Sequence, residues 1–372
     1  MSQIKIFLYT LCTLSGAIIG VGIFSLPYIT LKAGFWTMVG YFVVLGGIVI
    51  LIHSCYGALV LKTPDYKRLP GFAGLYLGKW GWKLAFISII LAIMGSNLAY
   101  LIVGGQFLQN LFSPVFGGGN LAYTLIYFSL GAILIFFGAK FISKFEFWGV
   151  VLFFAILIAI FIKEIPLLRV ENLFIKTVDF KYLFLPYGAI LFSLWGADVI
   201  PEAEELLGEK KKFLKVIVPS AIIVAIIIYL LFIYLILSIS GSQTTESALT
   251  GLRSYVGDKI LALGFLFGFL TTFTSFIAFG LTLVNTLCYD FKIPRAISWA
   301  ATCFIPLIIF LAGFTDFIKV ISFVGGVMMG FNGILILLMY QKIKERKISF
   351  LIFPLILILI TGIIYEVIYF LK

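Results

Sequence analysis

In this chain of 372 residues, 62% of the residues are hydrophobic and only 12% are charged, whereas about a quarter of the residues of a soluble domain are charged. A mean hydropathy of +1.18 therefore excludes an ordinary water-soluble fold and predicts an all-α protein embedded in the lipid bilayer. The net charge of +11 follows the membrane topology described below, so we do not interpret it as affinity for nucleic acid.

The apolar segments predict eleven membrane-spanning helices in one transmembrane domain, because a crossing needs about 20 apolar residues. The expected spans are 7–31, 35–61, 83–112, 121–139, 146–163, 182–207, 213–239, 257–289, 294–314, 318–341 and 349–371. Lys and Arg are about twice as frequent in the connections on the N-terminal side of the membrane as in those on the other side. This bias predicts a multi-pass protein of the cytoplasmic membrane with its N-terminus in the cytoplasm and its C-terminus outside.

The first span contains the most distinctive motif of the chain, Ser15–Pro27. It carries Gly16, Gly20 and Gly22 and ends in a proline, and these residue types weaken or break a helix. A broken helix is tolerated inside a membrane where its free backbone groups line a cavity or meet a ligand. We therefore expect an unwound segment at 19–23, with close helix packing by small residues as the competing interpretation.

The sixth span contains a second interruption, because Gly196, Asp198 and Pro201 fall in its middle. Breaks in spans 1 and 6 would occupy equivalent positions if spans 1–5 and 6–10 formed an inverted repeat. The expected organisation is a first repeat at about 7–163, a second at about 182–341 and one extra C-terminal helix at about 349–371.

Three motifs resemble those of the amino acid–polyamine–organocation superfamily. Gly16–Phe24 with Pro27 is similar to its first-span signature, and Trp195–Asp198 to its sixth-span signature. Thr274–Leu281, followed by Asp290–Arg295, resembles the eighth-span region of the amino acid/auxin and hydroxy/aromatic amino acid permease branch. The resemblance implies a leucine-transporter-like five-plus-five inverted repeat and amino acid uptake coupled to Na⁺ or H⁺.

The two breaks supply the candidate substrate site. Free N–H groups at the half-helix start in span 1 suit an α-carboxylate, which the family binds there, and carbonyls of span 6 can accept the substrate ammonium. Span 3 adds a polar wall. The candidate residues are Ile19, Gly20, Val21, Gly22, Ile23, Asn97, Tyr100, Phe192, Ser193, Trp195 and Asp198. No basic side chain falls at mid-span to meet an acidic substrate, and if Asp198 serves the half-helix no acid is left for a basic one. We therefore expect a neutral L-amino acid, bulky or aromatic.

Asp198 is an acid at mid-membrane, where insertion costs about 2.5–3.5 kcal/mol. Three roles remain open for it: binding the substrate ammonium, carrying a coupling proton, or capping the second half-helix. Glu204 and Glu205 lie nearer the cytoplasm, where we expect them to meet Lys210–Lys212 or a gate.

Span 8 carries three hydroxyls on one helix face, Thr271, Thr274 and Ser275. Together with the carbonyls of Gly16 and Ile19, which the resemblance adds, they would form an oxygen site for Na⁺. The alternative is that each hydroxyl bonds back to its own helix.

The remaining chemistry-bearing residues suggest no enzyme. The single histidine, His53, is expected to be a hydrogen-bonded packing group rather than a proton relay, and the four cysteines have no metal-site spacing. We expect a secondary active transporter without a cofactor, working by alternating access. An uncoupled exchanger and a non-transporting amino acid sensor remain alternatives, and protein partners are not predicted.

Overall fold

The computed structural model contains helices and no strands in the part of the chain that it describes, which is residues 3–63, 67–138, 155–156, 158–159, 162, 165–174, 180–343 and 349–371. Within these residues, seven helical stretches are long and apolar enough to cross a membrane, and a bent helix pair makes an eighth. One of the seven, Pro186–Gln243, contains the expected seventh span and most of the expected sixth. The expected fifth span, 146–163, lies almost wholly outside the described residues.

The expected first half folds as α1 (Gln3–Ile18), the 3₁₀ segment η1 (Val21–Ser25), α2 (Leu26–Ala33), α3 (Phe35–Lys62), α4 (Leu69–Phe116) and α5 (Asn120–Phe137). The short 3₁₀ segments η2 (Ile165–Leu167), η3 (Val170–Phe174) and η4 (Phe180–Tyr182) precede the sixth span.

The expected second half folds as α7 (Pro186–Leu194), η5 (Ala197–Val199), α8 (Ile200–Leu207), η6 (Gly208–Phe213), α9 (Leu214–Ser240), η7 (Gly241–Gln243), η8 (Leu249–Leu252), α10 (Asp258–Phe291), α11 (Arg295–Leu311), α12 (Phe317–Phe323), η9 (Val324–Met329) and α13 (Gly330–Ile343). The extra helix is α14 (Ser349–Leu371).

Two elements differ from the expectation. Helix α4 begins well before residue 83, but Gly78 adopts φ +77° and ψ −167° and separates a short helix from the long one that crosses the membrane. The expected tenth span is divided into α12, η9 and α13, and η9 is a π-helical segment. Such segments are often found at functional sites.

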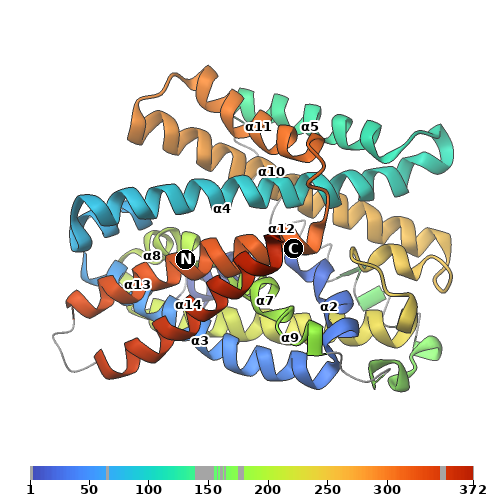
Figure 1. Cartoon of the computed structure of the whole chain (residues 1–372), viewed down its shortest axis with the longest axis horizontal. Helices are drawn as coiled ribbons and strands as arrows, with labels where there is room; N and C mark the ends of the chain where they lie inside the picture. Colours follow the sequence, from blue (N-terminus) through green and yellow to red (C-terminus); the bar gives the residue numbers. More distant parts are fainter. Residues whose placement is uncertain are drawn as a thin grey trace.

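The helices form two sets on either side of α4 (Figure 1). On one side α4 packs against α5, α10 and α11, and on the other α3 packs against α7, α9 and α13. The helices α1, α2, α7 and α8 that flank the two breaks lie within the second set. The outward surface carries exposed apolar side chains such as Trp36, Phe137 and Leu371, which suits contact with lipid.

Candidate functional site

The first span is broken where the glycine motif predicts it. Helix α1 ends at Ile18, η1 begins at Val21, and the two halves of the span are bent by 50°. Gly20 is extended, with φ −109° and ψ −156°, and its N–H donates to Ile18 O at 2.9 Å. Phe24 anchors the segment through edge-on contacts with Phe107 and Phe232, at centroid distances of 4.9 and 6.0 Å.

The sixth span is broken as predicted too. Helix α7 ends at Leu194, Trp195 is extended with φ −76° and ψ 123°, and η5 follows Gly196. Pro201 then occupies the first turn of α8, where its missing N–H is tolerated. Both predicted interruptions are therefore confirmed.

The two breaks touch each other through glycines. A Cβ atom on Gly22 would collide with Ser193 Oγ and lie 3.0 Å from Ser193 Cα, so only a glycine allows this approach. A Cβ atom on Gly196 would lie 2.5 Å from Ile18 Cγ1. The glycines of each break thus face a residue of the other break, which explains their position in the sequence.

A tyrosine of span 7 joins the two breaks. Tyr229 in α9 is fully buried, and its hydroxyl lies 2.9 Å from Ile18 O and 2.7 Å from Ser193 O. These carbonyls lie at the C-terminal ends of α1 and α7. Carbonyl oxygens at such an end have no hydrogen-bond partners within their own helix. Sequence analysis missed Tyr229, because one tyrosine in an apolar span carries no distinguishing pattern.

His53 in α3 holds the backbone of the second break. Its Nε2 atom accepts a hydrogen bond from Gly196 N at 2.9 Å, and its Nδ1 atom lies 2.9 Å from Val49 O. Because the Gly196 N–H must donate, Nε2 is the acceptor and Nδ1 carries the proton. The ring of Trp195 packs edge-on against the imidazole at 5.0 Å. This geometry agrees with the expected packing role of the histidine.

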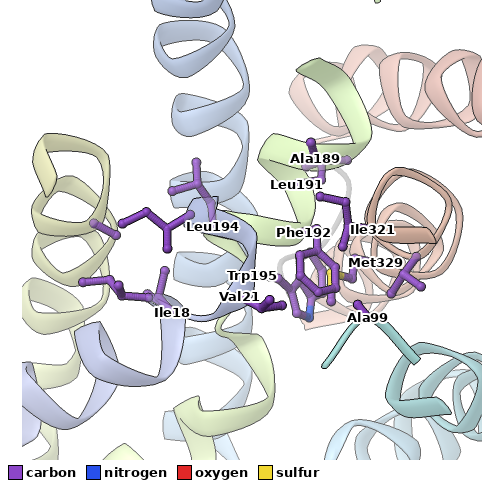
Figure 2. Packing of buried hydrophobic residues seen from close by; sticks show 14 of the residues in the cluster. Ile18, Val21, Ala99, Ala189, Leu191, Phe192, Leu194, Trp195, Ile321 and Met329 are labelled. Carbon is purple, nitrogen blue, oxygen red and sulfur yellow. The ribbon is translucent and has the colours of Figure 1, made fainter. Parts of the chain in front are cut away.

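Apolar side chains gather beside the breaks, as Figure 2 shows for Phe192, Trp195 and Met329. The structure brings together three predicted residues and three that sequence analysis missed. All six are buried: Val21, Phe192 and Trp195, and Ala99, Ile321 and Met329 from spans 3 and 10. We call this group the apolar wall. Only the fold identifies its last three members, since each is an ordinary apolar residue of an apolar span.

Several polar atoms near the breaks are buried without a hydrogen-bond partner among the described residues. They include both amide atoms of Asn97, Ser193 Oγ and Thr271 Oγ1. Tyr100, one turn after Asn97, places its hydroxyl 3.5 Å from the position that a Cβ atom on Gly20 would take. Since buried polar groups are normally paired, these atoms are the ones that a polar ligand or an ion would satisfy.

The acids of span 6 differ in their exposure and in their ion-pair partners. Asp198 is exposed on η5 and forms no capping bond among the described residues, so the structure does not support the capping role, one of the three left open for it. The physical reason is that the chain enters α8 through a 3₁₀ turn followed by a proline, which offers no N–H there. Glu202 approaches Arg68 at 3.8 Å, and Glu204 pairs with Lys211 at 3.4 Å, as expected for the latter.

The three hydroxyls predicted to bind Na⁺ lie on α10, which contacts η1, whereas the two predicted carbonyl ligands, Gly16 and Ile19, belong to α1 and the first break. Thr274 Oγ1 donates to Leu270 O at 3.0 Å and to Thr271 O at 3.1 Å, so the back-bonding alternative is present. A hydroxyl that donates in this way keeps its lone pairs for a cation. The described residues show no bond between these hydroxyls and the carbonyls of Gly16 or Ile19, and the ion site stays a prediction.

The fold is that of known transporters. The chain is similar to Mhp1, a nucleobase-cation-symport-1 family transporter, in a closed conformation with bromovinylhydantoin bound, at a TM-score of 0.63, 13% identity and coverage of 88% of this chain and 76% of that one. The inward-facing conformation of Mhp1 is similar at a TM-score of 0.64 and 12% identity, with coverage of 87% of this chain and 75% of that one. MhsT in complex with L-phenylalanine is similar at a TM-score of 0.60 and 16% identity, with coverage of 99% of this chain and 98% of that one.

These likenesses and the two facing breaks define a leucine-transporter-like membrane transporter, which confirms the expected fold class. The chain belongs to the tryptophan/tyrosine permease family, whose sequence profile matches residues 3–369. No curated protein sequence matches it. It is accordingly a secondary transporter rather than an enzyme, as expected. The assignment to the wider superfamily and its branch stays a prediction.

Proposed function

We propose that this protein carries an aromatic L-amino acid, tryptophan or tyrosine, across the cytoplasmic membrane by alternating access, driven by Na⁺ or H⁺. The observation that carries the proposal is the junction of the two breaks, where free backbone groups lie beside the apolar wall. The family name supports the substrate class, as does the L-phenylalanine complex of MhsT.

The substrate carboxylate would bind at the start of the outer half of span 1. The first N–H groups of η1, at Val21 and Gly22, have no partners within the segment, and η1 continues into α2 so that their dipoles add. Gly20 is extended just before them, and the space beside it is bounded by the hydroxyl of Tyr100. An anion suits this end of a helix.

The substrate ammonium would lie at the end of α7. The carbonyls of the last turn of a helix have no partner within the helix, and Ser193 O is one of them. Tyr229 has a single hydroxyl proton to share between Ser193 O and Ile18 O, and Ile18 O also accepts from Gly20 N. Ser193 O is therefore the carbonyl that keeps acceptor capacity for an ammonium group. The exposed carboxylate of Asp198 is the nearest acid along the chain and a second candidate acceptor.

The substrate ring would lie against the apolar wall. Phe192 and Trp195 offer ring faces and edges, while Met329 is a thioether that adapts to aromatic neighbours. Because Gly325 of η9 would collide with Phe192 N and Cβ if it had a Cβ atom, the wall is held tightly between span 6 and span 10.

The pair Arg68–Glu202 would close the cytoplasmic side, since it joins the start of α4 to α8, whereas Lys211–Glu204 is local to the continuous segment of α8 and η6. Partly exposed ion pairs of this length are weak, about 0–1 kcal/mol, which suits a gate that must open in each cycle.

Uptake into proteoliposomes tests the proposal. The full chain should accumulate labelled L-tryptophan or L-tyrosine when a Na⁺ or pH gradient is imposed, and L-leucine should compete weakly. Uptake that ignores both gradients but accelerates with internal amino acid would identify an exchanger. Binding of L-tryptophan without any uptake would identify a sensor. If neither L-tryptophan nor L-tyrosine bound, the proposal that the substrate is an aromatic amino acid would be contradicted.

A further inference from the structure

The extra helix α14 carries a buried acid that neither the substrate site nor the expected Na⁺ site uses. Glu366 has 1% of its surface exposed, within an apolar helix of 23 residues. Ionisable groups inside membrane-spanning helices are rare and usually functional. Sequence analysis overlooked Glu366 because it falls near the end of the last span, where an acid is commonly solvated.

Glu366 reaches the start of the broken sixth span. Its Oε1 atom accepts a hydrogen bond from Gly188 N, in the first turn of α7, at 3.1 Å. Its Oε2 atom is buried and has no hydrogen-bond partner among the described residues. A carboxylate normally accepts several hydrogen bonds, so one N–H leaves the charged form poorly satisfied.

Glycines from three elements bring the backbone close to this carboxyl group. A Cβ atom on Gly188 would lie 2.6 Å from Glu366 Oε1, and one on Gly326 of η9 would collide with Glu366 Cγ. A Cβ atom on Gly362 of α14 would collide with the ring of Tyr187. Helices α7 and α14 and the π segment are therefore packed without space for the hydration shell of an anion.

The described groups that face Glu366 do not balance a negative charge. The titratable groups close enough to interact electrostatically with Glu366 are phenols of α3, α7 and α14, namely Tyr41, Tyr187, Tyr365 and Tyr369. Segment η9 contains no titratable side chain, and the only charged residue of α13, Lys342, lies at the end remote from Glu366. Asp316 and Lys319 lie at the start of α12, and neither is ion-paired with Glu366 in the described part of the chain.

We propose that Glu366 is a proton-binding site, with the proton on Oε2 while Oε1 accepts from Gly188. We call the observed packing of α14 on α7, with Glu366 against Gly188, the docked arrangement. In it, a proton taken from water forms one O–H bond with the carboxylate and converts it into a neutral acid. Release of that proton to water regenerates the carboxylate, which needs hydration and therefore requires α14 and α7 to separate. The ligand is a proton, and the expected topology places the site near the outer membrane surface.

Proton binding at Glu366 would be linked to substrate binding, because α7 runs from Gly188 to the substrate break at Leu194. If the docked arrangement binds the substrate better, protons and substrate must strengthen each other's binding by the same factor. This linkage rests on the proposed function, whereas the proton site itself does not.

Infrared spectroscopy of the full chain in lipid nanodiscs tests the proton site without substrate. The wild type at neutral pH should show the carbonyl band of a protonated carboxylic acid, and Glu366→Gln should lose it. Glu205→Gln, which changes an exposed acid, should keep the band. A wild type without the band, or a band that survives in Glu366→Gln, would overturn the proposal. If the glutamine variant does not fold, Glu366→Asp replaces it and should shift the pH midpoint of the band.

The linkage has its own measurement. Glu366→Gln imitates the neutral acid and can still accept from Gly188, so it should bind L-tryptophan with an affinity that no longer depends on pH across the range where the wild type varies. Equal pH dependence in both proteins would refute the linkage. A protein that shows the infrared band but does not bind aromatic amino acids would refute the proposed function alone.

Discussion

Gly22 and Gly196 are the residues through which the two broken helices touch, and their lack of a side chain sets the distance between the breaks. Each faces a residue of the other break, Ser193 for Gly22 and Ile18 for Gly196. Gly20 is different, since a Cβ atom there would meet the hydroxyl of Tyr100 only at 3.5 Å. Gly20 is thus free to border a ligand, while Gly22 is fixed by packing.

Gly22→Ala should separate the breaks and weaken substrate binding. Overpacking by one methyl group costs about 1–3 kcal/mol, so we expect the affinity for L-tryptophan to fall by about 5- to 150-fold. Equilibrium binding to the purified protein measures this. Gly47→Ala in α3 is the matched control, because nothing lies within 4 Å of its added Cβ atom. Equal affinity of the two variants would show that the breaks do not form the site.

Tyr229→Phe should loosen the breaks without changing the shape of the core. It removes the donor to Ile18 O and Ser193 O, and a buried acceptor left without a partner costs about 1–3 kcal/mol. We expect a lower midpoint of thermal unfolding and slower uptake. Tyr234→Phe, further along α9, is the control. A thermal midpoint identical to that of the wild type would contradict the bridging role of Tyr229.

At the scale of elements, the two breaks could be predicted from sequence because glycine and proline act locally on the backbone. Glycines near residue 20 and near residue 196 both precede a proline that begins a half-helix. The π segment η9 could not be predicted, since Gly325 and Gly326 in an apolar run are also compatible with a regular helix. Asp198 does not take the capping role that was open to it, because the local turn, and not the residue type, decides which N–H groups are free.

In the candidate site, too, residues beside the breaks could be predicted from sequence, and residues contributed by other spans could not. Val21, Phe192 and Trp195 lie next to the breaks in sequence and were predicted, whereas Ile321 and Met329 come from span 10. Tyr229 and Glu366 contact the broken spans from α9 and α14. Contacts between distant segments depend on the packing of the helices, which periodicity does not specify.

The hydroxyls of the eighth span can be tested as ligands of the coupling ion. Thr274→Ala combined with Ser275→Ala would remove two neutral oxygen ligands from the expected Na⁺ site, so uptake should need a higher Na⁺ concentration. Substrate affinity at saturating Na⁺ should change less. Thr282→Ala, whose hydroxyl bonds back to Ala278 O at 2.9 Å on the same helix, is the control. A double variant with an unchanged Na⁺ requirement would exclude these ligands, and coupling would then fall to a proton.

At the scale of the whole molecule, the distribution of Lys and Arg predicts the orientation in the membrane. Glu209, beside the basic run of η6, should lie in the cytoplasm, and Asp258, at the start of α10, should lie outside. In cells that express a cysteine-free background, an impermeant thiol reagent added outside should label Asp258→Cys and not Glu209→Cys. The reverse labelling would invert the topology.

A structure determined with bound L-tryptophan tests the central claim most directly. The carboxylate should lie at the N–H groups of Val21 and Gly22, the ammonium at Ser193 O, and the indole against the apolar wall. The competing place is a cavity of about 200 Å³ at the end of α2, lined in part by Thr30, Trp36, Asn172 and Phe174. L-tryptophan bound only there, with the breaks unoccupied, would contradict the account.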